Sequence, residues 1–419
     1  MASVLANHFN IREVDAGTSC AAPPAAASQQ ESARDPATPT LSELRACLCG
    51  TGAEAGPAPS PIAKVMRAIY YLRTLGGDSA VDVLCDALQL RRYHSPLLRH
   101  EIGYVLGQMQ SQRACSALEA VLVDTTDDVM VRHECAEALG AIGAARSVPL
   151  LDRLADPAGM VEIRSPTQVG VAGVVDAEAV ADESASIDGN HILNNDSSSS
   201  SEGSENNIEN NSPFQATAVA THEPPEELRE TCEIARDFCK WKASGSEGSA
   251  PALACACMLS PYSTYDPAPP SPETDALSTQ ELGDLLIDPS TKLFERYRAM
   301  FALRNRGGEA CVVQLGRALV EDKTSALLRH EVAYVLGQMQ HPAAIDPLAE
   351  SLRRTAEHSM VRHEAAEALG AIEGDSAEME RCYALMREFS DPEKEANQCV
   401  RESCEVALDA ADYWRAYSA

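Results

Sequence analysis

Apolar residues recur at the spacing of an α-helix in many short segments of the chain. In residues 130–143 they line one face of a helix with 3.6 residues per turn; these residues are Val131, Cys135, Ala138, Leu139 and Ile142. A shorter amphipathic run precedes such a segment, as in residues 79–90 and 343–354. No hairpin or βαβ pattern competes with this spacing. The pattern therefore predicts pairs of helices, a shorter one followed by a longer one.

The longer helical segments repeat almost unchanged at two periods. Residues 97–110 read LLRHEIGYVLGQMQ and residues 327–340 read LLRHEVAYVLGQMQ. Residues 130–143 (MVRHECAEALGAIG) and 360–373 (MVRHEAAEALGAIE) are a second such pair. A period of 33 residues therefore lies inside a longer period of 230 residues, which is typical of a duplicated array of helical repeats.

Weaker copies flank these segments and bring each half to four units. Residues 66–77 match residues 297–308, and residues 228–237 match residues 400–409. Two helices per unit predict an all-α fold, a HEAT-like α-solenoid of eight helical-hairpin repeats in two halves related by a pseudo-twofold axis. Glycines near the ends of the longer helices indicate helix breaks or tight contacts between helices; they are Gly107, Gly140, Gly337 and Gly370.

Composition and the repeats divide the chain into four regions. Residues 1–40 become rich in alanine, proline and serine and are predicted to be a disordered extension. Residues 41–240 form the first half of the solenoid and residues 286–419 the second. Residues 241–285 between them include SPYSTYDPAPPSPE, whose prolines predict an extended linker.

The first half also carries an insertion at about residues 160–221. It has 96 residues between His133 and Arg229, whereas the second half has 38 residues between the equivalent positions. The extra stretch includes IDGNHILNNDSSSSSEGSENNIENNS, which is too polar to bury a core. We therefore expect a low-complexity segment that interrupts the solenoid before its fourth unit.

The net charge of −29 narrows the classes of partner. Proteins that follow a nucleic-acid backbone or bind an anionic membrane need a basic face, so neither partner is expected. An acidic protein attracts basic partners, and a lysine-rich protein substrate fits that charge. Residues 157–221 alone hold ten acidic residues against one arginine, which accounts for about nine of the negative charges.

The fourteen cysteines are scattered, and several lie inside helical patterns, such as Cys135, Cys232 and Cys404. The first residues lack the apolar core of a secretory signal, and no run of about 18 apolar residues predicts a membrane span. We therefore expect reduced thiols and a cytoplasmic protein. The C-x-C pairs at residues 47–49 and 255–257 lack the further ligands of a zinc site.

A His–Glu pair stands at the start of the two middle long helices of each half. Adjacent residues on a helix point about 100° apart, so one pair cannot hold one ion tightly. Stacked units from two opposed halves would nevertheless bring four imidazoles and four carboxylates around one cavity. These eight candidate metal ligands are His100, Glu101, His133, Glu134, His330, Glu331, His363 and Glu364.

This inventory of ligands indicates which metal the site would hold. Nitrogen and oxygen ligands without a thiolate suit iron or manganese better than structural zinc, and eight side chains suit two ions. Helical bundles with such ligands hold two irons. The HExxH motif of zinc proteases is excluded, because the fourth residue after each histidine is Tyr104, Glu137, Tyr334 or Glu367.

The alternative is that each His–Glu pair is a surface charge pair copied by duplication. Glu230 and Glu402 stand where the fourth unit of each half would carry its histidine, so the pairs persist only in four places. We therefore predict metal binding. Glu137 and Glu367 are candidates for groups that support the ligands. Structural roles are predicted for the arginine before each histidine and for two tyrosines: Arg99, Arg132, Arg329, Arg362, Tyr104 and Tyr334.

The sequences LLRHE…YVLGQMQ and MVRHE…AEALGAI, the YDPAPP linker and the final VRESCEVALD closely resemble the deoxyhypusine hydroxylases, also called deoxyhypusine monooxygenases. The resemblance covers about residues 41–156 and 222–419. It implies a HEAT-repeat enzyme with a non-haem di-iron centre of two Fe²⁺ ions. It further implies that dioxygen is used to hydroxylate the deoxyhypusine side chain of the translation initiation factor 5A precursor, which forms hypusine.

The resemblance also assigns roles to the eight residues. Each iron is expected to take two histidines from one half and a glutamate from the other. The two expected sets are His100 and His133 with Glu331, and His330 and His363 with Glu101. Glu101 and Glu331 are thereby the expected catalytic residues, and Glu134 and Glu364 weaker ligands or supports of the ligands. Two rival functions stay open: a protein-binding scaffold without metal, and a metal-dependent hydrolase that works without oxygen.

Overall fold

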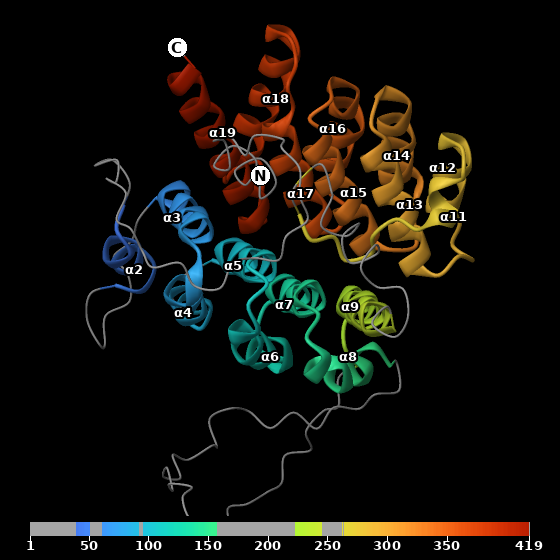
Figure 1. The fold of residues 1–419 in the computed structure, drawn as a ribbon. Helices are drawn as coiled ribbons and strands as arrows, with labels where there is room; N and C mark the ends of the chain where they lie inside the picture. Colours follow the sequence, from blue (N-terminus) through green and yellow to red (C-terminus); the bar gives the residue numbers. More distant parts are fainter. Residues whose placement is uncertain are drawn as a thin grey trace, which may run out of the picture. The chain divides into compact units, whose positions relative to one another are not determined.

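The computed structural model describes residues 39–50, 61–91, 95–156, 223–244, 262 and 264–418. Over these ranges the chain forms α-helices and short 3-10 helices and no strand, which confirms the predicted all-α class (Figure 1). The described residues belong to one compact unit, and a second unit, residues 164–222, lies outside them. The predicted insertion, nearly all of the predicted N-terminal extension and the C-x-C pair at 255–257 also fall outside the described residues.

The helices follow one another in the order that the repeats predict. In the first half they are α2 (Leu41–Cys49), α3 (Ile62–Leu75), α4 (Gly77–Leu88), α5 (Pro96–Gln108), α6 (Cys115–Val123), α7 (Val129–Ile142), α8 (Val148–Ala155) and α9 (Glu226–Ser244). In the second half they are α12 (Thr279–Ile287), α13 (Leu293–Arg306), α14 (Glu309–Glu321), α15 (Ala326–Met339), α16 (Ile345–Arg353), α17 (Ser359–Ala371), α18 (Ser376–Phe389) and α19 (Gln398–Ser418), with the short α11 (Pro272–Asp275) before them.

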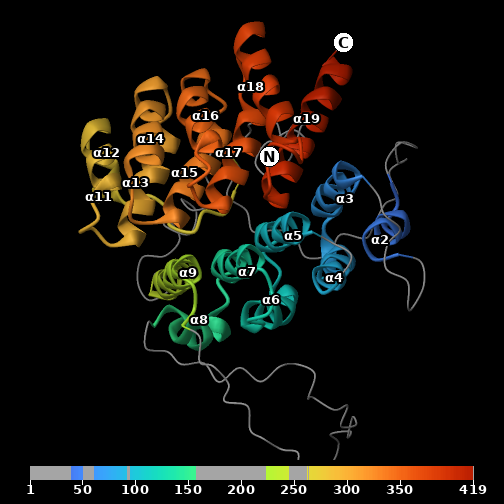
Figure 2. The same ribbon diagram turned by 180° about the vertical axis from the view of Figure 1, so that it is seen from behind.

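Consecutive helices pack in pairs, and the second helix of each pair packs against its counterpart in the next pair. Helices α3, α5, α7 and α9 form one such row, and α13, α15, α17 and α19 form the other (Figures 1 and 2). The two rows meet at both ends, because α19 contacts α3 and α5 while α9 contacts α13 and α15. We call the helices of these two rows the inner helices.

The prediction of an extended linker over residues 241–285 is wrong at both ends of that range. Helix α9 continues to Ser244, and α11 and most of α12 lie inside the range. The cause is local: the Ser278 hydroxyl accepts from the Glu281 amide at 3.2 Å, and the Glu281 carboxylate accepts from the Ser278 amide at 2.7 Å. This reciprocal cap starts α12, which then packs against α13 and α14.

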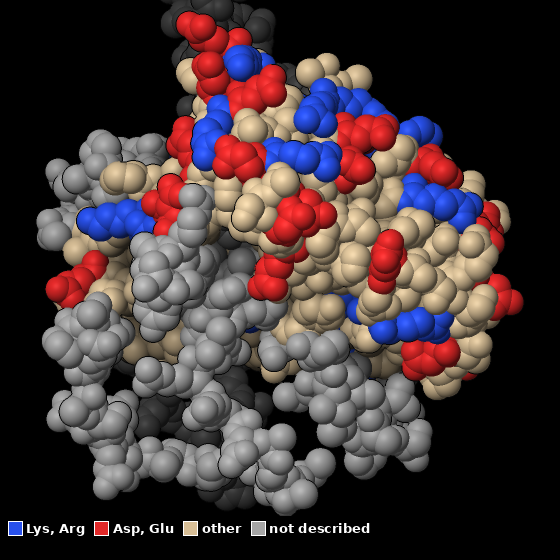
Figure 3. All heavy atoms as spheres, turned by 90° about the horizontal axis from the view of Figure 1, so that it is seen from above, with Lys and Arg blue, Asp and Glu red and all other residues tan. Residues whose placement is uncertain are grey.

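Figure 3 shows acidic and basic side chains interspersed on one face of the molecule. Exposed ion pairs also join consecutive units, such as Arg317 of α14 with Asp284 of α12 at 2.8 Å and Arg381 of α18 with Asp346 of α16 at 2.6 Å. Exposed ion pairs of this kind typically contribute about 0–1 kcal/mol each. They therefore add little to stability, which rests on the buried aliphatic core between the paired helices.

Glycines allow the inner helices to approach one another closely. A Cβ atom at Gly107 of α5 would lie 2.9 Å from Ala138 Cα of α7, and one at Gly337 of α15 would lie 3.0 Å from Ala368 Cα of α17. The same holds at Gly140 and Gly370, which face alanines of α9 and α19. All four glycines lie inside their helices, so they mark tight contacts and not helix breaks.

Gly337→Val is therefore expected to lower the free energy of unfolding by about 1–3 kcal/mol, because the backbone of α17 leaves no room for the side chain. The control is Ala310→Val on the exposed face of α14, which carries only the helix-propensity cost of valine, less than about 1 kcal/mol. Chemical denaturation of both variants measures the difference. Equal destabilisation of the two would show that the close approach of α15 and α17 is not required.

Candidate metal centre

All four His–Glu pairs occupy the same position relative to the start of their helices. The side chains of Ser95, Asp128, Ser325 and His358 each accept a hydrogen bond from a backbone amide of the first turn, and so begin helices α5, α7, α15 and α17. Each metal-site histidine follows its cap by five residues. A shared starting point gives the four pairs a shared direction, so equivalent helices present equivalent side chains.

The structure brings the four histidines into one buried cluster. The ring centroids of His100 and His133 in the first half are 5.3 Å apart, as are those of His330 and His363 in the second. Distances between the halves are similar: 5.2 Å from His100 to His363, 5.4 Å from His133 to His330 and 5.9 Å from His100 to His330. The two inner rows therefore contribute equally to one site, although their histidines are up to 263 residues apart in sequence.

The four glutamates of the pairs are buried with the histidines, and none of the eight residues is more than 4% exposed. Glu134 Oε2 lies 3.2 Å from His100 Nε2, and Glu364 Oε2 lies 3.7 Å from His330 Nε2. Three groups of residues could each hold an ion, because the ligand atoms within each group all lie within 4.8 Å of one another. The groups are His100, His133 and His330; His330, His363 and Glu364; and His133, Glu134 and Glu137.

Most polar atoms of this cluster form no hydrogen bond within the described part of the chain. None of the eight imidazole nitrogens forms a hydrogen bond there, and neither do the buried oxygens Oε1 of Glu101 and Oε1 of Glu364. A buried polar atom without a hydrogen bond typically costs about 1–3 kcal/mol. So many unpartnered ligand atoms in one place are the arrangement expected of residues that bind metal ions.

The pKa values in the cluster also favour a cation. Burial and the neighbouring imidazoles lower the pKa of His133 and of His330 well below the usual value. Burial and the charge of Glu134 raise the pKa of Glu331 to about 8. For His100 burial lowers the pKa, but the carboxylates of Glu134 and Glu101 more than offset it, so its pKa is raised. A divalent cation would bind the neutral imidazoles and stabilise the ionised carboxylates.

Two hydroxyl groups that the sequence did not single out donate hydrogen bonds to the site. The Tyr70 hydroxyl on α3 donates to Glu101 Oε2 at 2.6 Å. The Ser403 hydroxyl on α19 donates to Glu367 Oε1 at 2.9 Å, and that oxygen lies 3.8 Å from His363 Nδ1. Both residues lie in the weaker repeats, at positions where the two halves differ. Tyr70 aligns with Phe301, and Ser403 aligns with Thr231. That difference is the one feature of the sequence that distinguishes them from ordinary core residues.

Tyr104 and Tyr334 meet across the two halves, with 3.0 Å between their hydroxyl oxygens. Gln338 Nε2 donates to the Tyr334 hydroxyl at 3.0 Å, and Arg304 donates to Gln338 Oε1 at 2.8 Å. Arg304 in turn forms a buried ion pair with Asp266. The predicted core packing of both tyrosines is confirmed, and they also join α5 to α15 by a polar contact.

The arginine before each histidine has the structural role that the sequence predicts. Arg99 pairs with Asp127, and its Nε donates to the carbonyl of Leu88 at the end of α4 at 2.8 Å. Arg132 and Arg362 donate in the same way to the carbonyls that end α6 and α16, each at 3.0 Å. Arg329 pairs with Glu357. These arginines satisfy groups at helix ends and leave the imidazoles to face the site.

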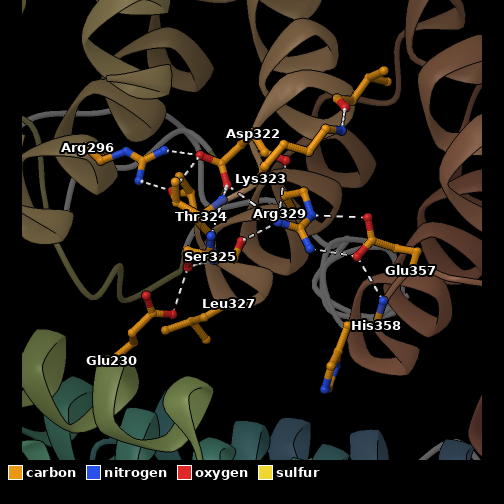
Figure 4. Close-up of polar contacts among 12 residues, drawn as sticks. Glu230, Arg296, Asp322, Lys323, Thr324, Ser325, Leu327, Arg329, Glu357 and His358 are labelled. Carbon is orange, nitrogen blue, oxygen red and sulfur yellow. Dashed lines mark hydrogen bonds and ion pairs between the residues drawn. The ribbon is translucent and has the colours of Figure 1, made fainter. Parts of the chain in front are cut away.

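Acidic residues of α9 fix the helices that carry His330 and His363 (Figure 4). The Ser325 hydroxyl, which caps α15, donates to Glu230 Oε2 at 2.8 Å, and His358 Nε2, in the residue that caps α17, lies 3.8 Å from Glu227 Oε1. Burial raises the pKa of Glu230 to about 7, although the Ser325 hydrogen bond opposes the change. Glu230 stands in the histidine position of the fourth unit and serves as a contact between the halves.

No described helix combines the length and the apolar character that a membrane span requires. Comparison with protein families finds HEAT repeats at residues 89–164, 279–370 and 318–395. The chain is 38% identical to the deoxyhypusine hydroxylase of Homo sapiens over 249 residues, 59% of this chain and 56% of that protein. It is 36% identical to the deoxyhypusine hydroxylase of Danio rerio over 247 residues, 59% of this chain and 56% of that protein. These alignments thus span less than two thirds of the relatives' length.

The agreement with a solved structure extends further. The structure of human deoxyhypusine hydroxylase in complex with glycerol superimposes with a TM-score of 0.62 and 34% sequence identity, over 89% of this chain and 96% of that one. The predicted HEAT-like α-solenoid is thereby confirmed, while the number of eight repeats stays a prediction. With one fold, the same repeats and this identity over nearly the whole of that structure, the chain belongs to the deoxyhypusine hydroxylase family.

Proposed function

We propose that this chain hydroxylates the deoxyhypusine side chain of the translation initiation factor 5A precursor, using dioxygen and two Fe²⁺ ions. The observation that carries the proposal is the buried cluster of four imidazoles whose eight ring nitrogens have no hydrogen bond in the described part of the chain. Relatives named deoxyhypusine hydroxylase supply the substrate class. Buried free thiols such as Cys135 and Cys404 support a reducing, cytoplasmic location.

The donor set fits iron better than the common structural metals. Imidazole and carboxylate suit Fe²⁺ and Mn²⁺, and the cluster contains no thiolate of the kind that structural zinc sites favour. From the resemblance to the deoxyhypusine hydroxylases we assign His100 and His133 with Glu331 to one ion, and His330 and His363 with Glu101 to the other. Glu134 and Glu364 also lie close to the histidines, at 3.2 Å from His100 Nε2 and 3.7 Å from His330 Nε2, and we assign them as additional ligands. The ions would supply the reduction of dioxygen and the oxidation of a C–H bond, which no side chain performs alone.

The residues of the chain orient the reactants and exclude water. The deoxyhypusine arm is a cationic polyamine, and the carboxylates of the cluster favour a positive charge beside them. Burial of all eight side chains keeps bulk water from the site, which protects an oxidising reaction from side reactions. The overall negative charge of the chain, −29, favours approach of a basic protein substrate.

Replacing either His133 or His363 by alanine is expected to leave about one iron per chain where the unaltered protein has about two, and to abolish hydroxylation. Metal analysis of purified protein and mass spectrometry of the modified precursor measure both effects. The control is His341→Ala, outside the cluster, which should keep iron and activity. Zinc in place of iron, or turnover without oxygen, would support a hydrolase. Full hydroxylation by either cluster variant would contradict the di-iron assignment, and unaltered protein with neither metal nor hydroxylation would support a scaffold.

The assignment of a glutamate from the opposite half is tested in the His133→Ala background, where the remaining iron is expected at His330 and His363. Adding Glu101→Ala should remove that iron, because the ion loses its carboxylate ligand. Adding Glu331→Ala instead should leave it in place. Iron content per chain is measured in both double variants. Loss of the remaining iron with Glu331→Ala and its retention with Glu101→Ala would show that each glutamate binds the ion of its own half.

A further inference from the structure

The two halves repeat the ligands of the site but not the hydrogen bonds that hold them. In the first half Glu101 accepts from the Tyr70 hydroxyl at 2.6 Å. In the second half Phe301 aligns with Tyr70 and has no hydroxyl group that could donate to Glu331. The two halves therefore differ by one hydroxyl group, and this hydroxyl donates to a carboxylate of the proposed metal site.

A second difference between the halves involves Ser403 of α19, the helix that packs against α3. Ser403 of α19 donates to Glu367, which lies beside His363. The equivalent residue of the first half is Thr231 of α9, whose hydroxyl donates to the backbone carbonyl of Glu227 in its own helix at 2.8 Å. The Ser403 hydroxyl thus donates to a carboxylate beside a histidine, whereas the equivalent Thr231 hydroxyl donates to a backbone carbonyl of its own helix.

Both additional hydrogen bonds act on the same proposed ion. In the assignment above, Glu101 joins His330 and His363, so Tyr70 fixes a carboxylate of that ion and Ser403 fixes the group beside one of its histidines. Tyr70 is 1% exposed and donates to Oε2 of Glu101, so the buried Oε1 forms no hydrogen bond. Oε1 lies 3.6 Å from His100 Nδ1, within the cluster where an ion would bind. A ligand that is already oriented loses less conformational freedom when the metal binds.

We propose that Tyr70 and Ser403 are positioning residues that make the two metal positions unequal. The ion held by His330, His363 and Glu101 binds first and more tightly, and the ion held by His100, His133 and Glu331 binds second. This inference rests on the proposed function, because it takes the cluster to be a site for two ions.

The test is an anaerobic titration of the full-length apoprotein with Fe²⁺ in competition with a coloured chelator, which yields stepwise dissociation constants. Unaltered protein should show two constants. His363→Ala should remove the tighter step and His133→Ala the weaker one. Tyr70→Phe should raise the tighter constant about 10- to 100-fold, the usual effect of removing a hydrogen bond to a metal ligand, and leave the weaker one unchanged.

The matched control is Tyr297→Phe. Tyr297 is an equally buried tyrosine on α13, but its hydroxyl donates to the backbone carbonyl of Leu327 at 3.5 Å and not to a carboxylate, so both constants should stay unchanged. Ser403→Ala tests the second hydrogen bond independently of Tyr70 and should also raise the tighter constant. Circular dichroism of each apoprotein verifies the fold before titration.

Three results would overturn the inference. They are a single constant for both ions, an unchanged tighter constant in both Tyr70→Phe and Ser403→Ala, and loss of the tighter step in His133→Ala. Each of these leaves two bound ions and the proposed function intact. An apoprotein that binds no Fe²⁺ at all would remove the proposed function together with the inference.

Discussion

The site depends on how closely successive inner helices approach one another. Gly107 faces Ala138 and Gly337 faces Ala368 at distances that leave no room for a larger residue. This contact holds α5 against α7 and α15 against α17, and the imidazoles at their first turns stand 5.3 Å apart in both halves. A wider spacing would keep the repeat fold but separate the ligands. Small residues at one end of the helices therefore control chemistry at the other.

Burial of the cluster lowers the free energy of unfolding, because buried polar groups without hydrogen bonds destabilise the folded chain. Eight imidazole nitrogens without hydrogen bonds in the described part of the chain are a large penalty for a protein of ordinary marginal stability. The arginines before the histidines, such as Arg99 and Arg362, satisfy nearby helix ends and so confine the unpartnered groups to the cluster. Metal ions would remove the penalty, and metal binding would then be coupled to the stability of the two inner rows.

Much of this arrangement can be predicted from the sequence because the repeats carry it. Segments that recur at the same place in a repeat are expected to adopt the same structure. The two copies each of LLRHE and MVRHE therefore predict four equivalent helices and four equivalent His–Glu pairs. Periodicity does not predict which residues meet across the two halves, and the contact between Tyr104 and Tyr334 appears only in the fold. Nor does it predict the donor to Glu101, because Tyr70 looks like one more core aromatic of α3. Helix α12 was missed because nearby prolines outweighed a local cap at Ser278.

On the proposed function, the imidazole cluster holds two metal ions between the halves. Anomalous diffraction at the iron absorption edge, from crystals of the purified chain grown without added metal, is the direct test. Two iron peaks are expected within the cluster, one beside His100 and His133 and the other beside His330 and His363. A cluster without anomalous density, a single ion shared by all four histidines, or density that appears at the zinc edge instead would contradict the proposed function.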